Sequence, residues 1–150
     1  MILQQTPYTN MFAIISIISI LLGLYIWRRF RVPEATIGML LILASVEWML
    51  ASVFQLVSID LPSKLFWNKL KYIGMVILPP LWVIFTLYYT EHEKKVTPHN
   101  IVFLSCIPAA TLILTFTNGM HGFIWSRITL EAKDTFLVLY HTYGVWFWVN

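Results

Sequence analysis

Long apolar runs separated by short polar segments dominate the chain. Four of the runs hold about the 20 residues that a helix needs to cross a hydrocarbon layer of about 30 Å. They cover residues 11–27, 36–57, 72–90 and 100–117. This pattern predicts an all-α integral membrane bundle with four complete transmembrane helices.

Polar segments connect the predicted helices. Arginines within residues 28–31 close the first run, and Pro33 marks a tight turn before the second. Residues 59–71 are interpreted as a polar connection, and residues 91–99 are charged. Pro98 is a suitable first-turn residue for the fourth helix. The four helices should therefore form two antiparallel helical hairpins.

The hydropathy pattern changes in the last third of the chain. Residues 118–142 are polar and aromatic, and they carry too many charges to span a bilayer. Alternating apolar and polar positions near residues 135–140 favour a short strand or hairpin. The apolar aromatic run near residues 144–150 is shorter than a crossing, so we interpret it as the start of a fifth helix. Residues 1–150 would then be one partial membrane domain, and any soluble output domain would lie beyond them.

Composition supports a bilayer environment. Apolar residues make up 59% of the chain and charged residues 11%, whereas soluble domains contain about 45–50% and 25%. The net charge of +3 is too small for a nucleic-acid-binding footprint. We therefore expect the lipid bilayer, and no nucleic acid, as a partner.

The basic residues bear on orientation, although they divide equally between the two ends of the predicted bundle. Those within residues 28–31, together with Lys94 and Lys95, lie in short loops. Positive residues in short loops are typical of the cytoplasmic side. We expect a multi-pass cell-membrane protein with an extracytoplasmic N-terminus. The residues that oppose this orientation are Lys64, Lys69 and Lys71.

Glu47 is the main candidate for function, because a carboxylate near the middle of a membrane helix must find a partner. Ala44 and Ala51 share its helical face and allow a neighbouring backbone to approach. Two interpretations remain open: Glu47 senses a ligand or proton, or it pairs helices structurally. Gln55 is a second polar residue in the same helix and also needs a partner.

The third predicted helix contains Gly74, Pro79 and Pro80. Proline cannot donate a backbone hydrogen bond, so the carbonyls four residues earlier lose their usual partners and the helix should kink. These residues are candidates for a hinge, and a fixed packing kink is the alternative.

Other features carry weaker signals. A stripe of small residues, Ser16, Ser19 and Gly23, could pack within the chain or form a homodimer contact. The spacing of the four histidines matches no metal-ligand signature, and there is no phosphate-binding loop. We expect no metal site, no cofactor and no catalytic constellation.

Several motifs resemble the seven-transmembrane N-terminal sensor region of membrane histidine kinases. The strongest is the Thr-Asn-x-x-His segment at residues 117–121, and Tyr-Gly-Val-Trp-Phe-Trp at residues 143–148 is similar to the start of the family's fifth helix. Further matches are Glu47-Trp48, the stretch from Lys64 to Gly74, and Pro79-Pro80-Leu81-Trp82.

The resemblance implies seven helices, an extracytoplasmic N-terminus and a cytoplasmic kinase or other output module. The phosphoacceptor histidine and ATP-binding lobe of the family are absent from these residues, so the chain itself should not be an enzyme. The resemblance adds Trp48, Asn118 and His121 to Glu47 and Gln55 as candidate sensing residues. Gln55 occupies a position where relatives often have Glu.

The predicted function is a membrane-embedded sensory input domain that relays a stimulus to a cytoplasmic output such as a histidine kinase. The alternatives are a small transporter or channel subunit, in which Glu47 would be a proton or cation site, and a structural membrane partner.

Overall fold

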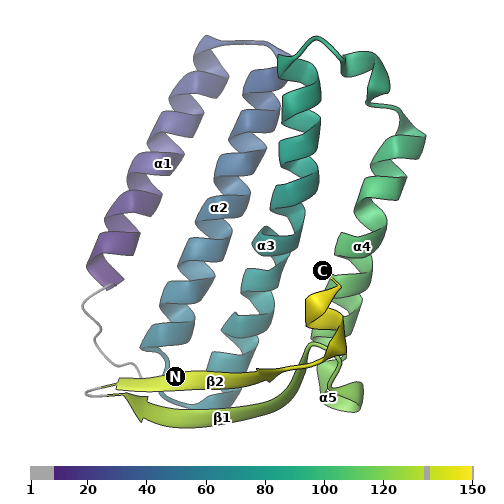
Figure 1. Cartoon of the computed structure of the whole chain (residues 1–150). Coiled ribbons are helices and arrows are strands. Elements are labelled where there is room, and N and C mark those ends of the chain that lie inside the picture. Colours follow the sequence, from purple (N-terminus) through teal and green to yellow (C-terminus); the bar gives the residue numbers. More distant parts are fainter. Residues whose placement is uncertain (1–8, 134–135, 150) are drawn as a thin grey trace.

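Four long helices form the main body of the computed structural model, which describes residues 9–133 and 136–149. They are α1 (Thr9–Arg29), α2 (Pro33–Val57), α3 (Leu61–Tyr89) and α4 (Pro98–Phe116). Within these described residues, all four helices are long and apolar enough to cross a membrane. They stand side by side, each antiparallel to its neighbour in the chain (Figure 1). The predicted helical membrane bundle is confirmed.

The predicted start of the third helix is wrong, because α3 begins at Leu61 and not at Tyr72. Asp60 caps the helix, its carboxylate accepting a hydrogen bond from the Ser63 N–H at 2.9 Å, and Pro62 occupies the first turn. Hydrogen bonding to Ser63 holds the pKa of Asp60 below its usual value. Most of the predicted polar connection is therefore the first turns of α3.

The other helix boundaries lie close to the predicted ones. Pro33 and Pro98 occupy the first turns of α2 and α4. In α4 the Thr97 side chain also caps the helix by accepting from the Asn100 N–H at 3.3 Å. Proline is tolerated here because a first-turn N–H has no partner within the helix.

α1 packs against α2 through its small residues. Ser16 is 2% exposed, and its hydroxyl lies 3.4 Å from the Met49 sulfur of α2. A Cβ added at Gly23 would meet the side chains of Met39 and Ile42. The stripe of small residues therefore packs within the chain.

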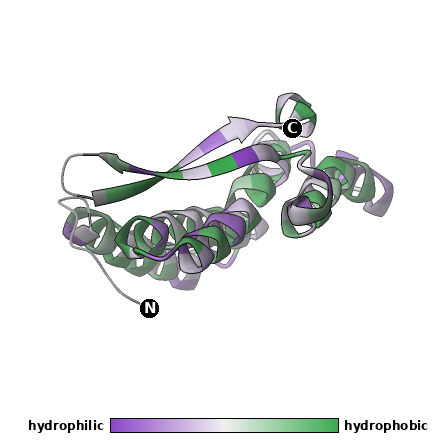
Figure 2. Cartoon of the chain, turned by 90° about the horizontal axis from the view of Figure 1, so that it is seen from below, coloured by the Kyte–Doolittle hydropathy of each residue, from purple (hydrophilic) through white to green (hydrophobic). Residues whose placement is uncertain are grey.

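A two-stranded antiparallel hairpin follows α4 and the short helix α5 (Asn118–His121). It consists of β1 (Trp125–Lys133) and β2 (Phe136–Tyr143), so the predicted hairpin is confirmed and is longer than the alternation in the sequence indicated. The hairpin crosses the end of the bundle where α2 turns into α3 (Figure 1). Figure 2 shows it along one side of the row of helix ends, with both hydrophilic and hydrophobic residues along its strands.

The segment after the hairpin is a short 3-10 helix, η2 (Val145–Trp148). Its Trp146 indole N–H donates to the Thr111 hydroxyl of α4 at 2.9 Å. The expected start of a fifth membrane helix at residues 144–150 thus has no α-helical turn in the described residues, and the fifth helix stays a prediction.

Buried apolar residues gather where the hairpin meets α3. Tyr72 and Val76 of α3 pack with Ile124 and Trp125 at the start of β1. The Tyr72 and Trp125 rings meet edge to face, with centroids 5.2 Å apart. This cluster fixes the base of the hairpin against α3.

Candidate functional site

Glu47 and Gly74 meet in the middle of the bundle. The half-buried Glu47 carboxylate of α2 accepts a hydrogen bond from the Gly74 N–H of α3 at 2.7 Å. A Cβ at Gly74 would overlap the Ala44 carbonyl oxygen as well as the Glu47 carboxylate. The missing side chain therefore lets α2 and α3 approach closely enough for the intramembrane acid to be bound by a backbone donor.

Gln55 lies two turns further along α2 and binds a lysine of α3. Gln55 is 8% exposed, and its side-chain oxygen accepts from the Lys71 ammonium at 2.8 Å. We call Glu47, Gln55, Asn68, Lys71 and Gly74 the polar seam, because these side chains and this glycine lie between or beside α2 and α3.

Two other lysines near the hairpin end satisfy helix C-termini. Lys64 is 1% exposed, and its ammonium donates to the Gln55 carbonyl at 2.9 Å and the Leu56 carbonyl at 3.3 Å. The Lys69 ammonium donates to the Phe116 carbonyl of α4 at 3.1 Å. The last carbonyls of a helix lack partners within it and carry partial negative charge. The lysines that oppose the predicted orientation therefore have a structural function at this end.

The hairpin contacts the polar seam through His141. The buried Asn68 amide donates to the His141 Nε2 at 3.0 Å, so this nitrogen is the acceptor of a neutral imidazole. Burial, with a smaller contribution from the Lys71 charge, lowers the pKa of His141 to about 4. The Asn68 side-chain oxygen is buried and has no hydrogen-bond partner among the described residues.

Asn118 fixes the start of the hairpin. Its side-chain oxygen accepts from the backbone N–H groups of Ile124 at 2.9 Å and Trp125 at 3.1 Å, and its amide donates to the Trp125 carbonyl at 2.9 Å. These three hydrogen bonds hold the loop after α5 against β1.

His121 makes a second contact within the same motif. Its Nδ1 accepts from the Phe123 N–H at 3.0 Å, and its Nε2 lies 3.0 Å from the Thr117 hydroxyl. The Thr117 hydroxyl itself donates to the Ile113 carbonyl, so the His121 Nε2–H is the donor to it. The Thr-Asn-x-x-His motif therefore joins the end of α4 to the hairpin.

The structure divides the predicted site residues into groups. It joins Glu47 to Gly74 in the polar seam, and Gln55 to Lys71. It places Asn118 and His121 at the hairpin base, and leaves Trp48 43% exposed on α2. α3 continues as a helix through Pro79 and Pro80, so their role as a hinge stays a prediction.

Sequence reasoning missed Asn68, Lys71 and His141. Asn68 and Lys71 lie in α3, but the helix was predicted to begin only at residue 72. Both residues were therefore assigned to a connection and not to a helix that faces α2. His141 was considered only as a metal ligand. It follows Leu137 and Leu139 at every second position, and this period of two was the clue that it shares their face of a strand.

Comparison with known proteins agrees with this architecture. The sequence model of a family described as "N-terminal 7TM region of histidine kinase" matches residues 11–150. No curated protein and no solved structure matches the chain. The matched region is a sensory membrane domain and not a catalytic kinase domain. The chain, a multi-pass membrane protein with four apolar helices in its described residues, belongs to the family of N-terminal seven-transmembrane regions of histidine kinases.

Proposed function

We propose that this chain is a membrane-embedded input domain that relays a stimulus to a cytoplasmic signalling output such as a histidine kinase. The observation that carries the proposal is the family match over residues 11–150. The four membrane-length helices support it, because a stimulus on one side of a bilayer must be passed through such elements to reach the other side.

The hairpin end is proposed to be extracytoplasmic. The opposite end of the bundle holds Arg28 and Arg29 in the last turn of α1, Arg31 in the turn that follows, and Lys94 and Lys95 between α3 and α4 (Figure 1). Lys64 and Lys69 at the hairpin end are held by helix carbonyls. These hydrogen bonds give the two lysines a structural role at the hairpin end, which supports the proposed extracytoplasmic N-terminus.

In this proposal the stimulus acts on the hairpin and moves α3. The His141–Asn68 hydrogen bond and the Tyr72–Trp125 contact connect the hairpin to α3. The Glu47–Gly74 contact connects α3 to α2 in mid-membrane. A ligand shifts such a system only if it binds one of two helix arrangements more tightly than the other.

Pro79 and Pro80 would be the pivot of this motion. They lie beyond Gly74 in the half of α3 that is remote from the hairpin. Neither proline has an N–H to donate, so the carbonyls of Met75 and Val76 lack the bonds that stiffen a regular helix. Bending there would displace the far end of α3 while leaving the polar seam closed.

The experiment compares stimulus-dependent autophosphorylation of the full-length kinase in membranes. Glu47→Gln and Pro79→Ala should each change the ratio of stimulated to basal activity by about tenfold, since allosteric coupling amounts to about 1–3 kcal/mol. Glu93→Gln and Pro98→Ala are matched controls, because Glu93 is exposed in the α3–α4 connection and Pro98 lies in a first turn. A wild-type response from both test variants would refute the proposed relay.

A further inference from the structure

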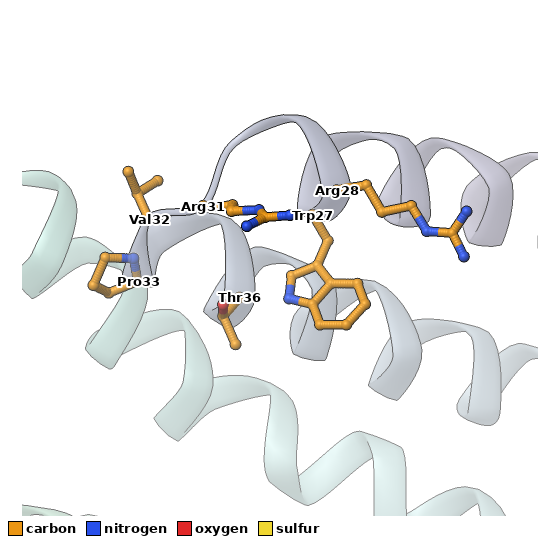
Figure 3. A pocket seen from close by; sticks show the side chains of 6 residues that line it. All are labelled: Trp27, Arg28, Arg31, Val32, Pro33 and Thr36. Atoms are coloured by element: carbon orange, nitrogen blue, oxygen red, sulfur yellow. The ribbon is translucent and has the colours of Figure 1, made fainter.

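An open cavity lies at the turn between α1 and α2, at the end of the bundle remote from the hairpin. Its volume is about 790 Å³, and it is lined by Trp27, Arg28, Arg31, Val32, Pro33 and Thr36 (Figure 3). In Figure 3 the Trp27 ring and Thr36 point to the same side of the ribbon, and Arg28 extends along α1. We call this space the turn cavity.

The turn cavity carries positive charge without a counterion among the residues that the structure describes. Arg28 and Arg31 are exposed and form no ion pair with any described residue. Glu34, the acid closest to them in sequence, is also unpaired within the described part of the chain. Two guanidinium groups beside an amphipathic indole favour an anionic oxygen ligand at a membrane interface.

A second hollow next to the turn cavity favours a lipid over a small soluble anion as the ligand. It is a shallow groove on α1 lined by Leu21, Leu24 and Tyr25, with Arg28 and Arg29 at its polar end. Arg28 therefore belongs to both the turn cavity and the apolar groove. A phosphate in the cavity would place an attached acyl chain along the groove, whereas inorganic phosphate would leave the groove unused.

We propose that the turn cavity is a binding site for an anionic phospholipid, with Arg28 and Arg31 supplying positive charge to the headgroup and one acyl chain lying against Leu21 and Leu24. Trp27 anchors the site at the level of the headgroups, and the Thr36 hydroxyl supplies a donor beside the phosphate. The site goes beyond the relay function and does not depend on which end of the bundle is cytoplasmic.

Native mass spectrometry of the purified full chain in detergent tests the proposal. Titration with phosphatidylglycerol and phosphatidylcholine should show about tenfold tighter binding of the first phosphatidylglycerol molecule. Arg28→Gln combined with Arg31→Gln should abolish that preference, since each basic residue near an anionic headgroup contributes about fivefold. Lys94→Gln combined with Lys95→Gln removes the same charge from the same end and should retain the preference.

Chemical footprinting of arginines in the wild-type chain tests the same proposal without depending on whether a variant folds. Phenylglyoxal should modify Arg28 and Arg31 at least fivefold more slowly with phosphatidylglycerol than with phosphatidylcholine, while Arg127 of the hairpin reacts equally in both. Inorganic phosphate at millimolar concentration should not reproduce the protection. Equal protection by inorganic phosphate, equal loss in the lysine variant, or no preference for phosphatidylglycerol would each overturn the proposal.

Discussion

At the residue scale, the contact between Glu47 and Gly74 shows how an ionisable group is accommodated in a membrane helix. An intramembrane carboxylate must be paired, hydrogen-bonded or protonated. Here no basic side chain reaches it in the described structure, and a backbone N–H at 2.7 Å serves instead. That solution needs a residue without a side chain on the facing helix.

Gly74→Ala should therefore destabilise the bundle. The added Cβ would overlap the Ala44 carbonyl and the Glu47 carboxylate, and such overpacking costs about 1–3 kcal/mol. Thermal unfolding of the purified chain in detergent measures the loss. Gly38→Ala is the matched control in α2, because its Cβ would meet only a Phe85 ring atom at an ordinary 3.7 Å. Equal unfolding temperatures for the two variants would contradict the proposed close approach.

At the element scale, the hairpin is held on α3 by one neutral histidine and a cluster of aromatic rings. The Asn68 amide donates to His141, and the His141 ring lies 5.5 Å from the Trp125 ring. Lys71 of α3 contributes positive charge near the imidazole, and the Tyr143 ring is nearly parallel to the His141 ring, with the ring centroids 6.4 Å apart. Protonation of His141 would turn its Nε2 from an acceptor into a donor, and this donor would then face the Asn68 amide, which is also a donor.

The hairpin should therefore loosen in acid. The pKa of His141 is about 4 in the folded chain and about 6.5 in the unfolded chain, so the unfolded state binds more protons between these values. Stability contributed by this contact is complete above about pH 6.5 and is lost as the pH falls towards 4. With partial exposure taken into account, the loss should be about 2 kcal/mol.

Hydrogen exchange of the β2 amides, followed from pH 7 to pH 4 and corrected for intrinsic rates, measures this loosening. His141→Gln keeps an acceptor for Asn68 and should remove most of the pH dependence. His99→Gln, at an exposed position in the first turn of α4, should leave it unchanged. If protection of the β2 amides in the wild-type chain did not change with pH, His141 would not control the docking of the hairpin on α3.

At the scale of the whole molecule, charge is arranged differently at the two ends of the bundle. Lysines near the hairpin are directed onto the C-termini of α2 and α4. Arg28 and Arg31 at the other end have no partner among the described residues and are available to headgroups or solvent. A simple count of basic residues treats the two ends as equal, so the proposed orientation rests on the short connections that hold Arg31, Lys94 and Lys95.

Cysteine accessibility tests this orientation. In a Cys106→Ala background, Thr129→Cys in β1 should react with a membrane-impermeant maleimide on intact cells. Lys95→Cys, in the connection between α3 and α4, should react only after the membrane is permeabilised. The reverse pattern would place the hairpin in the cytoplasm and reject the proposed direction of signalling.

Local sequence signals determined the membrane location, the four helices and most of their ends. An apolar run of about 20 residues is the length that a helix needs to span the hydrocarbon layer. Pro98 marked the first turn of α4 because proline restricts its own backbone and lacks an N–H there. Local signals gave the wrong start for α3. Its first turns contain the polar residues Lys64, Asn68 and Lys71, so the segment was predicted to be a connection. The two ammonium groups and the Asn68 amide hydrogen-bond to α2 and to the hairpin. Hydropathy does not register such contacts between elements.

Only the tertiary structure decided which polar groups meet. Glu47 was identifiable as a residue that needs a partner, but its pairing with Gly74 depends on the rotation and relative height of two helices. The contact of His141 with Asn68 joins residues that are 73 positions apart, and it exists because the hairpin folds back across the helix ends. Hydropathy is a property of each segment, whereas these hydrogen bonds require two segments to be positioned to within a few tenths of an ångström.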